Sequence, residues 1–114
     1  MISTQETTIR ILKFGGKYED WEMWSRKFMA KAMKKKYLTV LTGTKKAPKW
    51  DRALDISKPN EKELMELWEA NHEAYTDLTL SMTDQVPFGL VIESRTEDLP
   101  DGDAALAWKS LKAK

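Results

Sequence analysis

Apolar residues recur along most of the chain at the three- and four-residue spacing of an amphipathic α-helix. A first helix is predicted from about Asp20, whose side chain can cap the helix, with an apolar stripe that includes Trp21, Trp24 and Phe28. A longer helix is predicted from Pro59–Asn60, with Asn60 as its cap. The apolar stripe of this second helix comprises Leu64, Leu67, Trp68, Asn71, Tyr75, Leu78 and Met82.

Shorter apolar runs predict three further helical segments. Residues 38–41 can form one helical turn, which Gly43 would end. Residues 83–84 can cap a helix that tolerates Pro87 in its first turn. A last helix follows a cap at Asp101 or Asp103 and is apolar at Ala105, Leu106, Trp108 and Leu111.

These elements predict an all-α fold, a compact bundle of four to five helices with a short extended N-terminal arm. Residues 1–18 form the arm, in which 8–14 can be a short strand before the Gly15–Gly16 break, and residues 19–114 form the helical domain. Residues 44–59 are expected to be a loop, with a short helix near 49–54 and Trp50 pinned to the core. We expect the C-terminal helix to be cut short at Lys114.

Composition narrows the function classes. The 114 residues are 41% hydrophobic and 32% charged, which is typical of one soluble globular domain. The absence of cysteine excludes disulfides, cysteine zinc sites and iron–sulfur clusters, and a single histidine, His72, excludes a two-histidine site. We therefore expect no enzyme, no metal and no cofactor. We also expect a cytoplasmic location and no membrane contact, because the sequence has no long apolar run.

Five tryptophans allow two interpretations. They can stack on single-stranded nucleic acid, or they can build an aromatic core, and the place of all but the loop residue Trp50 on the helical stripes favours the core. His72 and the glutamates of the long helix are expected at the surface. The predicted core residues are Trp21, Trp24, Phe28, Trp68, Tyr75, Leu78, Trp108 and Leu111.

The net charge of +1 hides an uneven distribution. Residues 1–58 hold 14 Lys plus Arg and 6 Asp plus Glu, whereas residues 59–114 hold 5 and 12. The basic half can bind RNA, meet the acidic half of another copy, or pair weakly within one molecule. The candidate nucleic-acid-binding residues are Lys31, Lys34, Lys35, Lys36, Lys45, Lys46 and Lys49.

Several blocks, in order, resemble the Gag polyprotein of copia-type LTR retrotransposons. The resemblance covers about residues 9–114. It rests on Gly15, Lys17, Tyr18 and Trp21, then Leu38 to Gly43, Trp50, the segment Ala74, Leu78, Ser81 and Met82, and Asp103 to Leu111. The family's CCHC zinc knuckle has no counterpart, because the chain has no cysteine.

The resemblance implies a capsid N-terminal-domain-like fold whose function is self-assembly into a particle shell around element RNA. Many weak contacts between copies would be multiplied by valency. The expected partner is another copy of the chain, with RNA as a further candidate. Two alternatives remain from the residues alone: a stand-alone nucleic-acid-binding module that uses the 31–49 lysines, and an adaptor that binds a host peptide between its helices.

Overall fold

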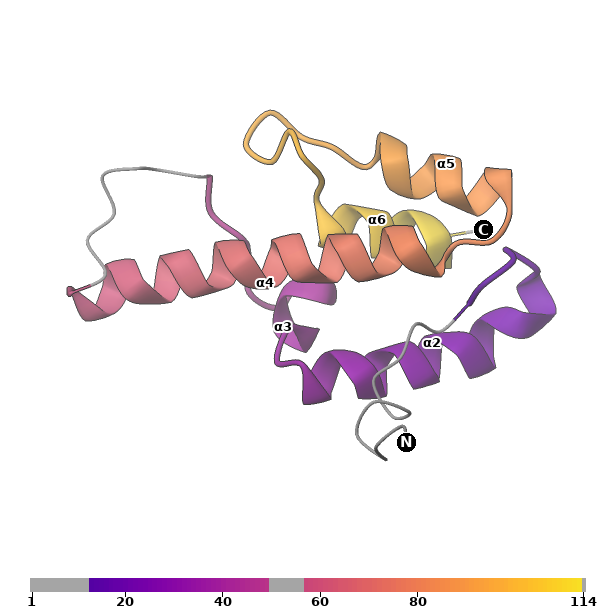
Figure 1. Cartoon of the computed structure of the whole chain (residues 1–114), viewed down its shortest axis with the longest axis horizontal. Helices are drawn as coiled ribbons and strands as arrows, with labels where there is room; N and C mark the ends of the chain where they lie inside the picture. The colour runs from indigo at the N-terminus through magenta and orange to yellow at the C-terminus, as the bar shows by residue number, and fades with distance from the viewer. Residues whose placement is uncertain (1–12, 50–56, 114) are drawn as a thin grey trace, which may run out of the picture.

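The computed structural model describes residues 13–49 and 57–113 (Figure 1). Within these residues the fold is all-α and contains no strand, as the periodicity predicts. The helices are α2 (Tyr18–Lys34), α3 (Leu38–Leu41), α4 (Pro59–Ser81), α5 (Gln85–Glu93) and α6 (Ala104–Lys112).

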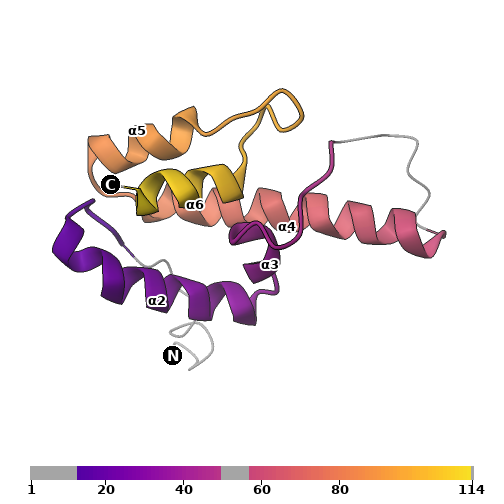
Figure 2. The ribbon, with the colours of Figure 1, turned by 180° about the vertical axis from the view of Figure 1, so that it is seen from behind.

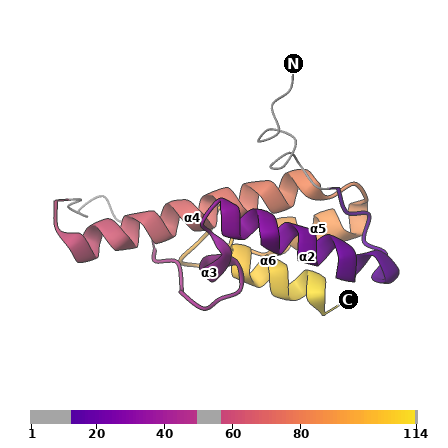
Figure 3. The same cartoon turned by 90° about the horizontal axis from the view of Figure 1, so that it is seen from below.

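The longest helix, α4, runs through the middle of the bundle. Helices α5 and α6 pack on each other and on α4, while α3 contacts α2, α4 and α6. Figures 1 and 2 show α2 on the other side of α4 from α5, and Figure 3 shows the N-terminal end of α4 extending beyond the other helices. The two halves of the sequence therefore meet where α2 and α3 face α4.

An aromatic cluster fills the core between α2 and α6. The Phe14 ring stacks on Trp24 with 4.6 Å between ring centroids, and Trp108 lies 5.7 Å from Phe28 and 5.2 Å from Trp21. Trp24, Phe28 and Trp108 are buried and Trp21 is half-buried against them. Because these rings pack against one another, they fit a structural core better than a stacking platform for bases.

The remaining predicted core residues take different positions. Leu78 and Leu111 are buried in the same cluster, and the half-buried Tyr75 packs against it. Trp68 is also only half-buried and packs against a smaller cluster, which consists of Val40, Ala47 and Leu99. Trp50 and most of the possible helix near 49–54 lie outside the described residues.

The chain preceding α2 is tied to the junction of α4 and α5. The Phe14 amide donates to the Ser81 carbonyl at 2.7 Å, and the Thr83 amide donates to the Phe14 carbonyl at 3.0 Å. These bonds make an isolated parallel bridge between Phe14 and Met82. The rest of the predicted strand at 8–14 lies almost wholly outside the described residues.

Two predicted helix caps are wrong, Asp20 by three residues and Asn60 by two. Helix α2 begins at Tyr18 after Lys17, so Asp20 lies inside the first turn, where its charge suits the helix dipole without capping. Helix α4 begins at Pro59 after Lys58, because proline has no amide hydrogen and fits the first helical position. The helical part thus starts one residue before the predicted boundary at 19.

Three other predicted helix boundaries are confirmed, the end of α3 and the starts of α5 and α6. Gly43 follows α3 with a φ of +82°, a conformation that favours glycine. Helix α5 follows Asp84 and carries Pro87 in its first turn. The Asp103 side chain accepts a hydrogen bond from the Leu106 amide at 3.2 Å and so caps α6.

Candidate functional site

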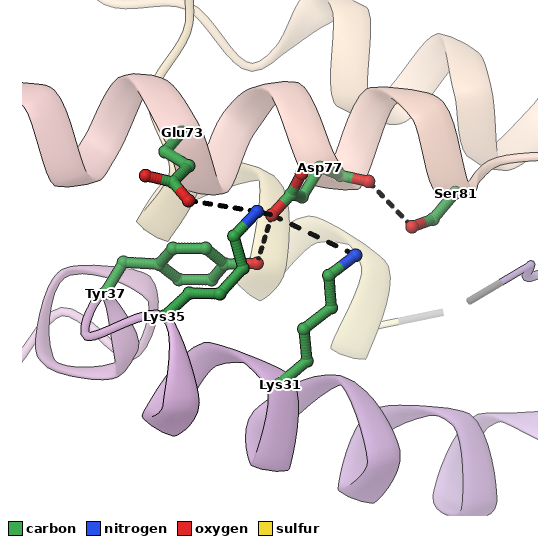
Figure 4. Close-up of polar contacts among 6 residues, drawn as sticks. All are labelled: Lys31, Lys35, Tyr37, Glu73, Asp77 and Ser81. Carbon is green, nitrogen blue, oxygen red and sulfur yellow. Dashed lines mark hydrogen bonds and ion pairs between the residues drawn. The ribbon is translucent and has the colours of Figure 1, made fainter. Parts of the chain in front are cut away.

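A cluster of charged side chains lies between α2 and α4 (Figure 4). One carboxylate oxygen of Asp77, Oδ2, accepts hydrogen bonds from Lys35 Nζ at 2.8 Å and from the Tyr37 hydroxyl at 2.7 Å. Lys31 Nζ lies 4.0 Å from the same oxygen, and Glu73 pairs with Lys35 at 2.9 Å. A single aspartate therefore joins α4 to α2 and to the residue that precedes α3.

Helical spacing explains why these groups meet. Lys31 lies in the last turn of α2 and Lys35, four residues on, caps that helix, while Glu73 and Asp77 are four residues apart on α4, so each pair lies on one face. Asp77 also lies beside Leu78 on the buried stripe of α4. The Ser81 hydroxyl donates to the Asp77 carbonyl at 2.7 Å, which ties the last turn of α4 back on itself.

The surroundings of the cluster shift the pKa values of Lys31, Lys35 and Tyr37. Burial lowers the pKa of Lys31, and the nearby Asp77 only partly opposes this effect. Burial also acts to lower the pKa of Lys35, but hydrogen bonds to Asp77 and Glu73 outweigh it and raise that pKa. Burial, followed by the hydrogen bond to Asp77, raises the pKa of Tyr37 far above its ordinary value. The tyrosine is thus held as a neutral donor to the carboxylate.

A lysine with a lowered pKa can act as a nucleophile or a general base, provided that a substrate can reach it. The side chain of Lys31 is only 2% exposed, and its amine lies between Asp77 and the Phe28 ring, whose centroid is 5.7 Å away. So small an exposure leaves almost no surface through which a substrate could reach the amine. The cluster therefore holds α2 and α4 together. We call it the lock; it consists of Lys31, Lys35, Tyr37, Glu73 and Asp77.

The lock predicts a loss of stability at high pH. Above about pH 10, the ordinary value for tyrosine, Tyr37 ionises in the unfolded chain while the folded chain keeps its proton, because the folded pKa is raised. The unfolded state then binds fewer protons, so the free energy of unfolding falls by up to about 1.4 kcal/mol per pH unit from this group. Urea unfolding at pH 9, 10 and 11 should show a shallower fall for Tyr37→Phe than for the unchanged protein. Equal slopes would contradict the prediction.

The lock also divides the predicted lysine patch. Lys31 is buried and Lys35 is half-buried and paired, so neither belongs to an exposed basic surface. The prediction that all the lysines of residues 31–49 form one basic patch is thus wrong for these two residues, because the helical period turns them toward α4. Lys34, Lys36, Lys45, Lys46 and Lys49 are exposed.

Opposite charges from the two halves of the sequence pair within the molecule. Lys45 Nζ lies 3.4 Å from Glu63, and Lys31 and Lys35 reach α4 as described above. The Lys45 pair is exposed and contributes little, whereas the Asp77 pairs are largely shielded from water. Part of the uneven charge distribution is therefore used to hold the fold together.

A second polar connection orders the loop between α5 and α6. The Asn71 amide group donates to the Gly102 carbonyl at 3.0 Å, and the Ala104 amide donates to Asn71 Oδ1 at 2.8 Å. His72, one residue on, is exposed and stacks on Trp68 with ring centroids 5.6 Å apart. Asn71 and His72 line a cleft of about 360 Å³. Asn71 therefore holds the loop against α4, and His72 lies at the surface as expected.

An apolar groove lies where α2, α5 and α6 meet at one end of the bundle, on the right in Figure 1. Its volume is about 70 Å³, and Phe14, Trp21 and Leu90 contribute to its lining. Tyr18 and Val86 stand beside it and are 79% and 71% exposed. Large apolar side chains in open solvent next to one another are a common mark of a contact surface.

Sequence reasoning named neither Asp77 nor Tyr37 as important, although both positions carry a signal. Asp77 is a carboxylate within the apolar stripe of α4, and such a residue needs a partner from another element. Tyr37 follows a run of three lysines that begins at the last residue of α2, and it is fully buried. A buried acid on one helix, with lysines at four-residue spacing on another, is the pattern that could have located the lock.

Three negative findings complete the description. Among residues 13–49 and 57–113, no three His, Asp or Glu side chains are grouped so that they could hold a metal ion. In the same part of the chain, no helix has both the length and the apolar character needed to cross a membrane. The chain matches no family model, no curated protein and no solved structure at a significant level.

Proposed function

We propose that this chain is a structural self-assembly domain of the Gag or capsid type, which builds a particle shell through weak contacts between copies. The all-α bundle is compatible with the capsid-like fold that the sequence resemblance implies. Such a shell would assemble in the cytoplasm around element RNA. The proposal requires no chemistry from the chain, only surfaces that hold copies together.

The observation that carries the proposal is the exposure of large apolar side chains in a small domain. Single exposed apolar residues are ordinary, but adjacent ones mark a contact. Here Tyr18 and Val86 both line one groove. The large hydrophobic residues exposed by more than a third are Tyr18, Met23, Met33, Leu64, Leu80, Val86, Phe88 and Leu106.

Self-assembly predicts that the mass in solution rises with protein concentration. Sedimentation velocity from about 10 μM to about 1 mM should show a shift from monomer to larger species, since weak single contacts have dissociation constants in this range. Salt should change the association, because charged residues border the apolar surface. A protein that stays monomeric at about 1 mM in low and in high salt would contradict the proposed function.

Nucleic-acid binding remains the second candidate, because five of the predicted lysines are exposed. The same sedimentation experiment can include a labelled single-stranded RNA at low salt, where phosphate contacts are strongest. If RNA binds, changing Lys34 and Lys36 to Glu should weaken it, whereas changing the buried Lys31 would test the fold instead. No co-sedimentation of RNA at low salt would remove this candidate.

A further inference from the structure

The end of the bundle at which α2, α5 and α6 meet combines an apolar centre with charges of both signs. The apolar centre is formed by Tyr18, Trp21, Val86, Pro87 and Leu90. Figures 1, 2 and 3 all show the start of α2, the start of α5 and the end of α6 at this same end. We call this the α2–α5–α6 surface.

Charged residues of both signs lie around this surface, including the exposed Lys17 before α2 and Asp84 before α5. Glu19 and Asp20 lie in the first turn of α2, and Lys109 and Lys112 lie in the last turn of α6. Tyr18, the residue before Glu19, and Lys112 line the same groove, so the first turn of α2 and the last turn of α6 both reach this apolar centre. Within the described residues, none of these four charges forms an ion pair.

Such an arrangement is complementary to itself. When a second copy is turned by a two-fold rotation, the acidic turn of each copy faces the basic turn of the other, while the two apolar centres face each other. A groove of about 70 Å³ is too small to enclose a peptide, and Tyr18 and Val86 protrude beside it. Both features fit a broad contact between two copies better than a peptide site.

We propose that the α2–α5–α6 surface is the contact through which two copies of this chain pair about a two-fold axis. This inference rests on the proposed self-assembly and names its surface. Burial of Tyr18 and Val86 would supply the apolar centre of the contact. The two acids of each copy would pair with the two lysines of the other, and these four ion pairs at the rim would set the orientation. The contact is weak by itself, as an assembly that depends on valency requires.

The first test replaces an exposed residue of the surface with a charge. Val86→Glu places a carboxylate in the apolar centre, and because Val86 is exposed near the start of α5, the fold tolerates the change. The dissociation constant measured by sedimentation should rise about tenfold or more. Met33→Glu is the matched control, because Met33 is 67% exposed at the far end of α2. It should leave the dissociation constant within about twofold.

The second test reverses the charges at the rim. Glu19→Lys alone and Lys112→Glu alone should each weaken pairing, because each places like charges opposite one another. The double variant, which exchanges the two signs, should restore the affinity of the unchanged protein at low salt. Far-ultraviolet circular dichroism of each variant confirms that the helices are intact. Failure of the double variant to recover would overturn the two-fold orientation.

The outcomes separate this inference from the proposed function. If the unchanged chain associates and Val86→Glu weakens association no more than Met33→Glu, the surface is wrong while self-assembly stands. If the unchanged chain stays monomeric at about 1 mM in low and high salt, both proposals fall. A loss of pairing in Val86→Glu alone, with recovery in the double charge variant, is the result that we expect.

Discussion

An Asp77→Leu variant is expected to lose about 3–5 kcal/mol of unfolding free energy, because it leaves the buried amine of Lys31 without its carboxylate. The change also removes the acceptor of the Tyr37 hydroxyl, which is buried and would have no partner there. A loss of this size is a large part of the total stability of a domain of this length. Urea unfolding followed by tryptophan fluorescence measures it.

Three further variants show whether the lock is the cause. Glu73→Gln removes an acid that is half exposed and pairs only at the edge of the cluster, so it should cost less than about 1 kcal/mol. Asp77→Asn keeps an acceptor oxygen for Tyr37 and provides a measurable variant if Asp77→Leu does not fold. Lys31→Met in the Asp77→Leu background should recover part of the loss, because the unpaired buried charge is gone. An Asp77→Leu variant within about 1 kcal/mol of the unchanged protein would contradict the lock.

A Gly102→Ala variant is also expected to lose a large part of its unfolding free energy. Gly102 has a φ of +133°, which side chains rarely adopt, and this strain costs about 1–3 kcal/mol. A methyl group at this position would also overlap the ring of Tyr75, which adds about 1–3 kcal/mol. The Tyr75 hydroxyl donates to the Val91 carbonyl at 2.7 Å, so the ring cannot move without breaking that bond. Thermal or urea unfolding gives the size of the loss.

Gly89 offers a matched control for this prediction. It lies inside α5, and a methyl group there would meet no atom within 4 Å. Gly89→Ala should therefore stabilise the protein by about 0.5–1 kcal/mol, because alanine is the better helix former. Equal effects of the two substitutions would mean that the close approach of the loop to Tyr75 does not limit the fold.

The lock and the proposed contact surface lie in different parts of the molecule. Asp77 joins α4 to the C-terminal end of α2 through Lys31 and the cap residue Lys35, whereas Tyr18 and Val86 lie at the starts of α2 and α5. Changes to the surface can therefore be made without touching the lock. This separation makes association and stability independent measurements for the variants described above.

The helices and the composition of the core could be read from the sequence because both depend on local spacing. Apolar residues at three- and four-residue intervals define one face of each helix, and Trp24, Phe28, Leu78, Trp108 and Leu111 are buried as that face requires. The cap at Asp103 and the helix end at Gly43 are likewise local signals. The starts of α2 and α4 do not follow from this spacing, because a proline at the first helical position and acids inside the first turn compete with capping side chains.

The sequence by itself determined an all-α chain, its apolar stripes and its two oppositely charged halves, because these features depend only on residue type and spacing. The tertiary structure alone decided which of those charges are available to a partner. Lys35 meets Asp77 across 42 residues and Tyr37 meets it across 40, and such pairing depends on how closely α2 approaches α4. Packing thus places Lys31 and Lys35 in the lock and leaves Lys34 and Lys36 exposed, since residues four apart share a face while their neighbours point elsewhere.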